Sequence, residues 1–355
     1  MLRFLLLTSL LALGVVAVFS IGVKQNKQSA SASAMLSVIA FYNLENFYDT
    51  LDDPLTNDND FLPSGIKQYG TAIFEHKVQQ LASVLSGIGP LSNTAPPNII
   101  GVAEIENRRV LEILCRHPLL QKQRYGIIHY NSPDPRGVDV ALLYNEKNIR
   151  ILYSKAIPVA LPGGSKEARF TRDILYVKAM LGGDTLHLFV NHWPSKRGGE
   201  VRSAPARMVA AVTCRKLLDS IREKDSGAKM IVMGDFNDNP NSGSIKNKLG
   251  ASGNREKMNS VQLYNPWLRW YMHGLGTLAN RDHWSLFDQI LISAPLLDSS
   301  RRGWFFAGEG IYQQPFMREN QGRYRGYPMR TWEGNRYRGG FSDHFPTYIL
   351  LRKKY

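Results

Sequence analysis

The sequence predicts a single α/β domain in which packed β-sheets are covered by a few helices. Many short apolar runs have the length of strands, whereas only three segments have the apolar spacing of an amphipathic helix. With 355 residues, of which 43% are apolar, the chain is long enough to bury one large core. Because residues 35–355 contain no repeat and no linker-like stretch, we expect them to form one domain with sheets inside and helices outside.

The expected elements follow one another as strands bounded by turn residues. Apolar and β-branched runs predict strands at 35–42, 99–103, 125–130, 138–144, 151–160, 174–181, 186–191, 230–234, 289–292 and 347–351. Apolar positions recurring every three or four residues predict helices at 73–85, 110–115 and 205–223. Residues 241–280 are rich in Gly and Asn, so we expect irregular structure there.

The first 34 residues have the pattern of a targeting segment. Arg3 precedes an almost wholly apolar stretch, residues 4–23, and a polar run and the small-residue tract 30–34 follow. The apolar stretch is long for a cleaved signal and close to the length of a spanning helix. We therefore expect export, either as a secreted or periplasmic protein or with residues 1–34 kept as an N-terminal membrane anchor.

The chain is strongly basic, with 44 Lys and Arg against 30 Asp and Glu, a net charge of +14 and a pI near 9.7. Such a charge favours polyanionic partners, namely nucleic acid, phosphorylated lipid or an anionic membrane surface. The only two cysteines, Cys115 and Cys214, lie in segments of helical pattern. Two buried thiols are the simpler interpretation, although an exported protein could pair them. No Cys and His cluster has zinc spacing, and we expect a monomer.

Polar side chains recur at the ends of the predicted strands. The clusters are Asn43/Glu45, Glu104/Glu106, Asn191/His192, Asp235/Asn237 and Asp343/His344, with Asp288 at the head of a further strand. Strand ends at one rim of a sheet can converge on one pocket, where carboxylates bind a hard cation and imidazoles act on a phosphate. Asp235 and Asn237, two residues apart, are expected to share a face. The Asp could take a proton from water or help to hold a divalent cation, and the Asn could orient that water by hydrogen bonding.

Together these motifs resemble the endonuclease/exonuclease/phosphatase superfamily. The matching segments run from about residue 36 to 352 and include Asn-Leu-Glu-Asn (43–46), Ala-Glu-Ile-Glu-Asn (103–107), Arg-Gly-Val-Asp-Val-Ala (136–141), Asn-His-Trp-Pro-Ser (191–195), Gly-Asp-Phe-Asn-Asp (234–238) and Ser-Asp-His-Phe-Pro (342–346). The resemblance implies a four-layer α/β sandwich of two packed, mostly antiparallel sheets flanked by helices. It also implies hydrolysis of phosphoesters with Mg²⁺ or Mn²⁺.

The same resemblance implies which residues lie at the metal. Glu104 matches the family's metal-binding Glu, Asn43 matches its strand-end Asn beside the metal, and Asp343 matches the Asp before the terminal His. One position departs from the family pattern, because Ala103 stands where many members have Gln. That Gln is not a ligand in the family, so the assignment is kept.

The remaining roles concern the water and the phosphate. Asp235 and Asn237 match the pair that positions and activates the attacking water. His344 would contact the scissile phosphate, Asp288 matches the acid that fixes its orientation and charge, and His192 matches the second His of the deoxyribonuclease and sphingomyelinase branches. Either histidine could protonate or stabilise the leaving group.

Two further residues are predicted to bind phosphate. Arg136 sits where the deoxyribonuclease and sphingomyelinase branches place a phosphate contact, and Asn191 directly precedes His192. Residues 301–340 hold eight Arg and nine aromatic residues against three Glu. Such a mixture suits nucleic acid, with cations on the backbone and rings stacking on bases, or it is a β-rich segment whose aromatics pack and whose Arg face water.

These observations leave three hypotheses. The first is an exported, metal-dependent phosphoesterase acting as a nuclease through an activated water. The alternative is a phosphatase or a phospholipase C-type enzyme acting on small or lipid phosphates. The third is a non-catalytic polyanion-binding protein on the same fold. Polyanion binding would weaken steeply with salt, whereas a small-phosphate enzyme would respond far less.

Overall fold

The computed structural model describes residues 35–90, 95–161 and 169–355 of the chain. The predicted signal or anchor segment, residues 1–34, lies outside the described residues. From Met35 onward the chain groups into one unit. No helix in the described part of the chain combines the length and the apolar character needed to cross a bilayer.

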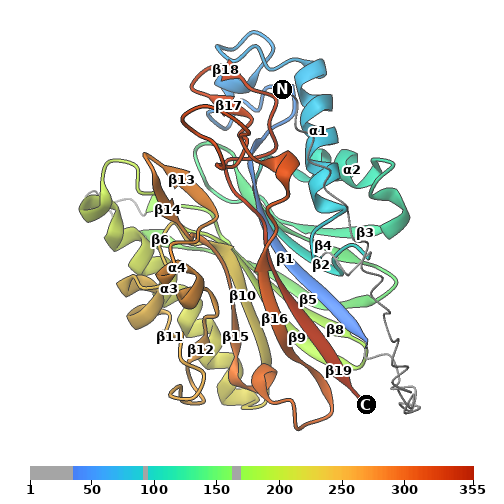
Figure 1. Cartoon of the computed structure of the whole chain (residues 1–355), viewed down its shortest axis with the longest axis vertical. Coiled ribbons are helices and arrows are strands. Elements are labelled where there is room, and N and C mark those ends of the chain that lie inside the picture. Colours follow the sequence, from blue (N-terminus) through green and yellow to red (C-terminus); the bar gives the residue numbers. More distant parts are fainter. Residues whose placement is uncertain (1–34, 91–94, 162–168) are drawn as a thin grey trace, which may run out of the picture. The chain divides into compact units, whose positions relative to one another are not determined.

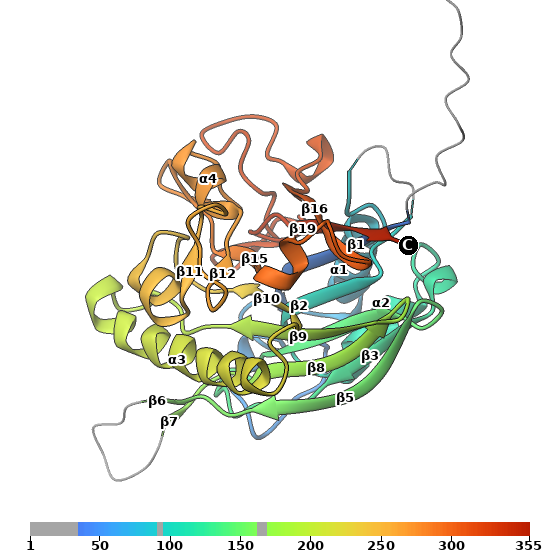
Figure 2. The same ribbon diagram turned by 90° about the horizontal axis from the view of Figure 1, so that it is seen from below.

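Two large sheets form the centre of this unit (Figures 1 and 2). The six-stranded sheet has the order β16 (Gly303–Ile311), β19 (Thr347–Lys354), β1 (Leu36–Phe47), β2 (Ile99–Ile105), β4 (Asp139–Asn145) and β3 (Tyr125–His129). The seven-stranded sheet has the order β11 (Ala251–Ser252), β12 (Leu263–Tyr264), β15 (Asp288–Ser293), β10 (Lys229–Asp235), β9 (Asp184–His192), β8 (Ile174–Leu181) and β5 (Ile149–Ile157). Most neighbours are antiparallel; the parallel pairs are β1/β2, β9/β10 and β11/β12.

The helices cover the outer faces of the two sheets. The larger apolar cluster joins α1 (Thr71–Leu85) and α2 (Arg108–Arg116) to the six-stranded sheet and fills the space between the sheets. A second cluster joins α3 (Glu200–Lys224) to the outer face of the seven-stranded sheet (Figure 2). The layers are therefore helices, sheet, sheet and helix, which confirms the predicted α/β sandwich with mostly antiparallel sheets.

Every predicted strand and helix is present, but some boundaries were wrong. The predicted strand 151–160 ends at Ile157, because Pro158 has no N–H to donate to a ladder. Helix α3 begins at Glu200 and contains Pro205, which was expected to start it. The region 241–280 is less irregular than expected, since it contains β11, β12 and the short helix α4 (Trp267–Met272).

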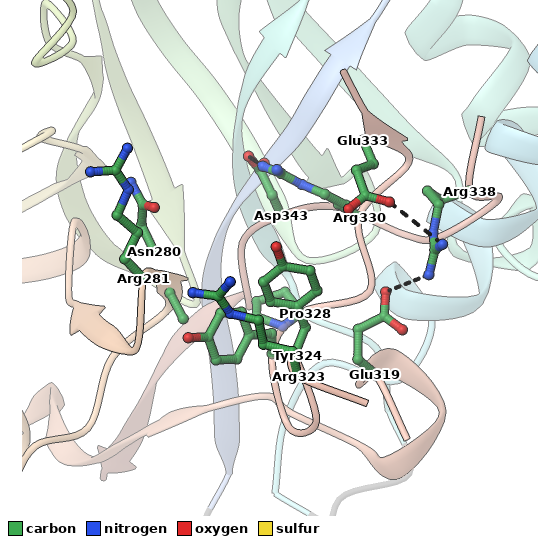
Figure 3. Close-up of a pocket in the computed structure, with 12 residues that line it drawn as sticks. Asn280, Arg281, Glu319, Arg323, Tyr324, Pro328, Arg330, Glu333, Arg338 and Asp343 are labelled. Carbon is green, nitrogen blue, oxygen red and sulfur yellow. Dashed lines mark hydrogen bonds and ion pairs between the residues drawn. The ribbon is translucent and has the colours of Figure 1, made fainter. Parts of the chain in front are cut away.

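The Arg- and aromatic-rich segment 301–340 divides into two parts. Its first part is the edge strand β16, in which Trp304 is buried, as the interpretation of a β-rich segment with packed aromatics predicted. The second part leaves the sheet and forms a long excursion that carries the hairpin β17 (Trp332–Glu333) and β18 (Arg336–Tyr337). The excursion returns to β19 at its N-terminal end. With the hairpin of β13 (Leu278–Asn280) and β14 (His283–Ser285) it encloses a pocket that reaches Asp343 (Figure 3).

Candidate active site

Side-chain alternation brings three polar residues of the seven-stranded sheet into one row. Val190 and Met233 belong to the core between the two sheets, and the next residue on the same face of each strand is polar. These residues are His192 on β9 and Asp235 on β10, while Asp288 begins β15 on that face. The cross-strand register pairs Asp235 with both His192 and Asp288. The row is therefore fixed by backbone pairing.

The six-stranded sheet contributes Asn43 to the same place. Asn43 Nδ2 donates a hydrogen bond of 3.1 Å to Asp235 Oδ2, and Asn43 Oδ1 accepts one of 2.9 Å from the backbone N–H of Glu45. Both Asn43 and Asp235 are buried. This hydrogen bond crosses from one sheet to the other and holds one oxygen of the Asp235 carboxylate in place.

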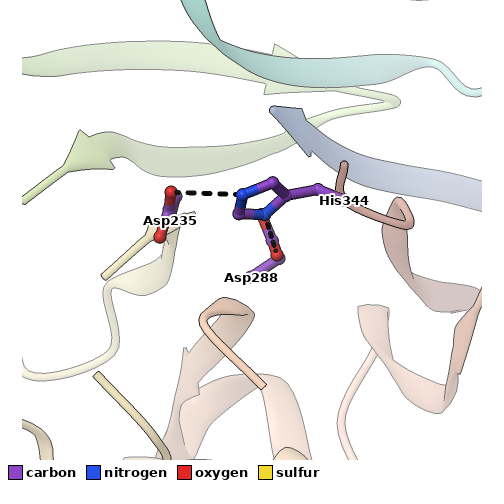
Figure 4. A group of neighbouring side chains, drawn as sticks. All are labelled: Asp235, Asp288 and His344. Carbon is purple, nitrogen blue, oxygen red and sulfur yellow. Dashed lines mark hydrogen bonds and ion pairs between the residues drawn. The ribbon is translucent and has the colours of Figure 1, made fainter. Parts of the chain in front are cut away.

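His344 enters from the loop that precedes β19 (Figure 4). Its Nδ1 lies 2.7 Å from Asp288 Oδ2, and its Nε2 lies 4.0 Å from Asp235 Oδ2. Burial would lower the pKa of His344, but Asp288, Asp343 and Asp235 together raise it well above its usual value. His344 is therefore an imidazolium at neutral pH, with Asp288 fixing the ring.

Asp235 has an environment suited to proton transfer. The pKa of its carboxyl is raised to about 7: burial and the charge of Asp288 raise it, while His344 and the backbone N–H of Asn237 oppose the rise. A base is most effective when its pKa is close to the working pH. The carboxylate of Asp235 is thus tuned for accepting a proton from water.

His192 differs from His344 in its charge state. Its Nε2 lies 3.7 Å from both Glu104 Oε1 and Asp235 Oδ2, and its ring is buried. Burial, reinforced by the positive charges of Arg172 and Arg136, lowers the pKa of His192 well below its usual value. The imidazole is therefore neutral at pH 7. Of the two histidines, only His344 carries the positive charge that would stabilise a phosphate.

Left-handed backbone conformations surround the site. Glu45, Asn46, Glu104 and Asn237 have φ between 50° and 59°, although none is glycine. The pairing register of β1 with β2 shifts over Asn43 to Phe47, and that of β2 with β4 shifts at Glu104. Such bulges redirect side chains next to active sites. The bulge at Glu104 brings its carboxylate to His192, whereas a regular strand would turn it toward the helices.

The prediction that Asp235 and Asn237 share a strand face was wrong. Strand β10 ends at Asp235, and Asn237 lies in the left-handed turn that follows. The two residues are coupled differently, because the Asn237 N–H donates a 2.9 Å hydrogen bond to Asp235 Oδ1. Asn237 Nδ2 donates to the Trp193 carbonyl at 3.0 Å, which leaves its Oδ1 available for a water.

Asn191, predicted to bind phosphate, does not face the site. Neighbouring strand residues point to opposite faces, so Asn191 turns toward α3 when His192 turns inward. Asn191 Oδ1 accepts a 3.1 Å hydrogen bond from the indole of Trp193, and its Nδ2 donates to the carbonyls of Phe189 and Met233. The polar atoms of this buried amide are hydrogen-bonded to the Trp193 indole and to strand carbonyls, so the phosphate-binding prediction for Asn191 was wrong.

Arg136 lies at the edge of the site, in a recess that also contains Lys67, Arg197 and Arg330. Burial would lower the pKa of the Arg136 guanidinium, but Glu104, Asp134 and Asp235 raise it. Its carbonyl accepts a hydrogen bond of 2.7 Å from the Tyr48 hydroxyl, which anchors its backbone. Arg136 is therefore a fixed positive charge near Glu104 and Asp235.

Two groups of residues have to be considered as metal ligands. The ligand atoms of Asp235, Asp288 and His344 lie within 4.8 Å of one another. However, His344 Nδ1 is occupied by Asp288, and Asp235 already accepts hydrogen bonds from Asn43 and Asn237. This group is better described as a hydrogen-bonded set of polar side chains than as a site that encloses a cation.

The carboxylates of Glu104 and Asp343 fit a hard cation better. Among the described residues, neither Glu104 Oε1 nor Asp343 Oδ1 accepts a hydrogen bond. His192 Nε2 lies 3.7 Å from Glu104 Oε1 and His344 Nε2 lies 3.8 Å from Asp343 Oδ1, and both distances are too long for a hydrogen bond. Both side chains are partly exposed, and free carboxylate oxygens are the ligands that Mg²⁺ and Mn²⁺ prefer. The amide of Asn43, predicted beside the metal, gives one N–H to Asp235 and accepts one hydrogen bond from the Glu45 N–H, so its Oδ1 keeps a second lone pair.

Sequence reasoning missed two basic residues that support the site. Arg330 donates a 2.7 Å hydrogen bond to Asp343 Oδ2; His344 and Arg330 lower the pKa of Asp343 against the opposing effect of burial. Lys77 on α1 is buried beside Glu45 and donates to the Thr331 hydroxyl and to the Phe341 carbonyl at 2.8 Å. Neither contact leaves a local signal, because each joins segments far apart in the chain.

A family model described as the endonuclease/exonuclease/phosphatase family matches residues 38–353. The chain belongs to this family. Its members are phosphoester hydrolases and generally depend on divalent metal ions. The predicted family resemblance is thereby confirmed. A search of curated proteins finds no match.

Solved structures share the fold at low sequence identity. D. rerio TDP2, complexed with a single-strand DNA product, is 14% identical over 89% of this chain and 98% of its own, with a TM-score of 0.53. An endonuclease/exonuclease/phosphatase family protein from Bacteroides thetaiotaomicron is 15% identical over 91% of this chain and 99% of its own, with a TM-score of 0.52. The mannosyl-6-phosphatase Bt3783 from Bacteroides thetaiotaomicron is 16% identical over 89% of this chain and 99% of its own, also at 0.52. These likenesses establish the fold.

Proposed function

We propose that this protein is a metal-dependent phosphodiesterase that cleaves nucleic acid by attack of an activated water. The observation that carries the proposal is the buried set around Asp235, in which Asn43, His192 and His344 all lie within 4.0 Å of one carboxylate oxygen. The set places a base with a pKa near 7 beside an imidazolium. In phosphodiester hydrolysis the base can accept the proton of the attacking water, and the imidazolium can stabilise the negative charge that develops on the phosphate.

In the proposed reaction a water lies between Asp235 and the free oxygen of Asn237. Asp235 accepts the proton of the water as its oxygen attacks phosphorus opposite the leaving oxygen. The positive charge of His344, held by Asp288, stabilises the negative charge that grows on the phosphate oxygens. The neutral His192 contributes a hydrogen bond and no charge.

Glu104 and Asp343 are the proposed metal ligands. A divalent ion held by these carboxylates would supply a further positive charge to stabilise the phosphate oxygens. Arg330 holds one oxygen of Asp343, and the Asn46 N–H donates a 2.9 Å hydrogen bond to one oxygen of Glu104, so each carboxylate is oriented through one oxygen while the other stays free. Arg136 then lies on the same side as a phosphate contact.

The distribution of charge favours a polyanion as substrate. The recess beside the site is about 470 Å³ in volume, and it is lined by four cations, Lys67, Arg136, Arg197 and Arg330, against three acids, Glu45, Asp60 and Asp343. This recess lies on a chain of net charge +14. Several cations in one recess of a basic chain suit a polyanion, which offers more than one phosphate, better than a single small phosphate.

A phosphatase acting on small phosphate esters is the second candidate. The pocket beside Asp343 has a volume of about 330 Å³, which is enough for one small phosphate ester. One solved structure of the same fold is described as a mannosyl-6-phosphatase. This candidate uses the same set around Asp235 and differs only in what occupies the pockets.

The substrate is tested by hydrolysis assays with the purified protein in Mg²⁺ or Mn²⁺, with Asp235→Ala as the blank. Single-stranded and plasmid DNA, RNA, sphingomyelin, and inositol and sugar phosphates are compared side by side. We expect nucleic-acid cleavage whose KM rises steeply with salt. Cleavage of small or lipid phosphates alone would refute the nuclease assignment and support the second candidate.

We also propose that residues 1–34 direct export, because an apolar stretch follows Arg3 and a small-residue tract ends the segment. Fractionation of cells that express the chain with a C-terminal tag tests this. The tagged protein should lie outside the cytoplasm, in the membrane if the segment is retained. Recovery of uncleaved chain in the cytoplasm alone would contradict export.

A further inference from the structure

We propose that the pocket beside Asp343 is a nucleoside subsite, in which the ring of Tyr324 stacks on one base and Arg281 and Arg323 bind the adjoining phosphate. This inference rests on the proposed nuclease function and names the part of the substrate that the pocket takes. The pocket has a volume of about 330 Å³ (Figure 3). That volume lies at the lower end of the range of about 300–1,000 Å³ for ligand pockets and suits a single nucleotide.

The pocket is held in shape by contacts between its two walls. The Tyr327 hydroxyl donates a 2.7 Å hydrogen bond to Asp282 Oδ1 and accepts one of 2.7 Å from the Asp282 N–H. These bonds tie the excursion to the tip of the β13–β14 hairpin. Backbone hydrogen bonds of 2.8 and 2.7 Å between Glu319 and residues Tyr327 and Gly326 close the loop that presents Tyr324. The subsite is therefore largely formed before a ligand binds.

The cations of the pocket fall into two classes. Arg330 is paired with Asp343 at 2.7 Å, and Arg338 lies 3.5 Å from both Glu319 and Glu333. By contrast, neither Arg281 nor Arg323 has a carboxylate within 4.0 Å among the described residues.

Arg281 and Arg323 are both exposed at the mouth of the pocket, and their guanidinium groups are free to bind an anion (Figure 3).

An aromatic ladder leads from the mouth of the pocket to the catalytic histidine. Tyr324 lies 5.6 Å from Tyr327 between ring centroids, Tyr327 lies 5.7 Å from Trp284, and Trp284 stacks on Phe345 at 6.3 Å. Phe345 is buried and directly follows His344. A chain of ring contacts therefore places Tyr324 on the same wall of the pocket as the segment that carries His344.

Tyr324 is the member of the ladder that is available to a ligand. Its side chain is 43% exposed, whereas Phe345 is fully buried. Arg323 lies 5.9 Å above its ring, so a cation and an aromatic face are presented together. This combination is what single-stranded nucleic acid requires, because each nucleotide offers a flat base and a charged phosphate. A sugar phosphate or a lipid headgroup has no flat ring to match it.

The test uses the full chain and single-stranded DNA oligonucleotides in which one nucleoside at a time is replaced by an abasic tetrahydrofuran. Tyr324→Ala removes the ring, and Tyr324→Phe keeps it. Tyr355→Ala is the matched control, because this exposed tyrosine follows the far end of β19, about 25 Å along the strand from His344.

We expect Tyr324→Ala to raise KM for the intact oligonucleotide by roughly 5- to 160-fold, the range for the loss of one base stack, with kcat nearly unchanged. In the wild type, one abasic position should raise KM by a similar factor, and in Tyr324→Ala that position should lose its effect. Tyr324→Phe and Tyr355→Ala should match the wild type. Arg281→Ala should raise KM and reduce its dependence on salt.

The outcomes separate this inference from the proposed function. If the wild type cleaves oligonucleotides but Tyr324→Ala behaves like Tyr355→Ala, the subsite is wrong and the nuclease assignment stands. The same conclusion follows if Tyr324→Ala keeps the abasic pattern of the wild type. If the wild type cleaves no nucleic acid, the proposed function fails and the nucleoside subsite fails with it.

Discussion

Replacing Asp288 by Asn tests the electrostatic role of the buried Asp288–His344 pair. Asp288 is fully buried, and its Oδ2 lies 2.7 Å from His344 Nδ1. The asparagine carbonyl can still accept the imidazole N–H, so the ring should keep its place while the negative charge is lost. Two unit charges about 4 Å apart at an effective dielectric constant of about 20 interact by about 4 kcal/mol. If His344 must be an imidazolium in the transition state, Asp288→Asn should lower kcat by up to about 1,000-fold.

The pH dependence of Asp288→Asn has a defined sign. Burial lowers the pKa of His344, and Asp288 is the largest of the influences that raise it. Removing the Asp288 charge therefore lowers the pKa of His344. Activity that depends on the imidazolium is lost as pH rises through that pKa, so the alkaline limb of the kcat/KM profile should move to lower pH.

The assay is steady-state hydrolysis of an oligonucleotide over a pH series, with a melting curve to show that the fold persists. Asp298→Asn is the control, because it makes the same chemical change at an aspartate that pairs with the exposed Arg301. Its rate should equal that of the wild type. A folded Asp288→Asn enzyme with kcat within about twofold of the wild type would refute the charged role of His344.

Three further predictions concern stability and the thiols. Lys77→Met leaves the buried Phe341 carbonyl and Thr331 hydroxyl without their donor, so it should lower the free energy of unfolding by about 1–3 kcal/mol in urea; a loss within error would contradict this. Burial raises the pKa of Glu45 from 4.5 to about 7, so the folded state binds a proton that the unfolded chain has released. Stability should fall as pH rises from about 4.5 to about 7, and Glu45→Gln should flatten this slope; an unchanged slope would exclude Glu45 as its source. Burial also raises the pKa of the free thiols Cys115 and Cys214 to about 12. A thiol reagent should therefore react with both cysteines only after unfolding. Absence of reaction in the unfolded chain would contradict this and indicate a disulfide.

Much of the fold was predictable from the sequence because most strands are continuous apolar runs. The exception is β16, in which Gly303, Gly308, Glu309 and Gly310 interrupt the apolar pattern. What defines this strand is its pairing with β19. β16 ends at Ile311 and β19 begins 36 residues later, at Thr347. An edge strand with exposed positions carries little of the core, so its sequence is less constrained.

The candidate site was predictable as a set of residues but not in its geometry. Strand alternation correctly brings Asp235 and His192 to one face, and the same rule excludes Asn191, which the sequence prediction had included. The left-handed turns at Glu104 and Asn237 redirect those side chains, and nothing in their local sequence calls for glycine-like backbone.

Tertiary contacts account for the rest of what the sequence did not show. Arg330 and Lys77 were missed because their partners, Asp343 for Arg330 and Thr331 and Phe341 for Lys77, lie in other elements. Tyr324 was recognised only as part of an Arg- and aromatic-rich segment. The structure divides that segment, since Trp304 and Trp332 pack in the core while Tyr324 faces the pocket.

The central claim is that Asp235 is the base of a metal-dependent hydrolysis, and the most direct test compares the wild type with Asp235→Asn on one oligonucleotide in Mg²⁺ and in EDTA. Asparagine keeps the size of the side chain and cannot accept the proton. We predict that EDTA abolishes cleavage by the wild type and that Asp235→Asn, folded as judged by its melting curve, loses about 10²- to 10⁴-fold in kcat. Full cleavage by folded Asp235→Asn, or by the wild type in EDTA, would contradict the claim.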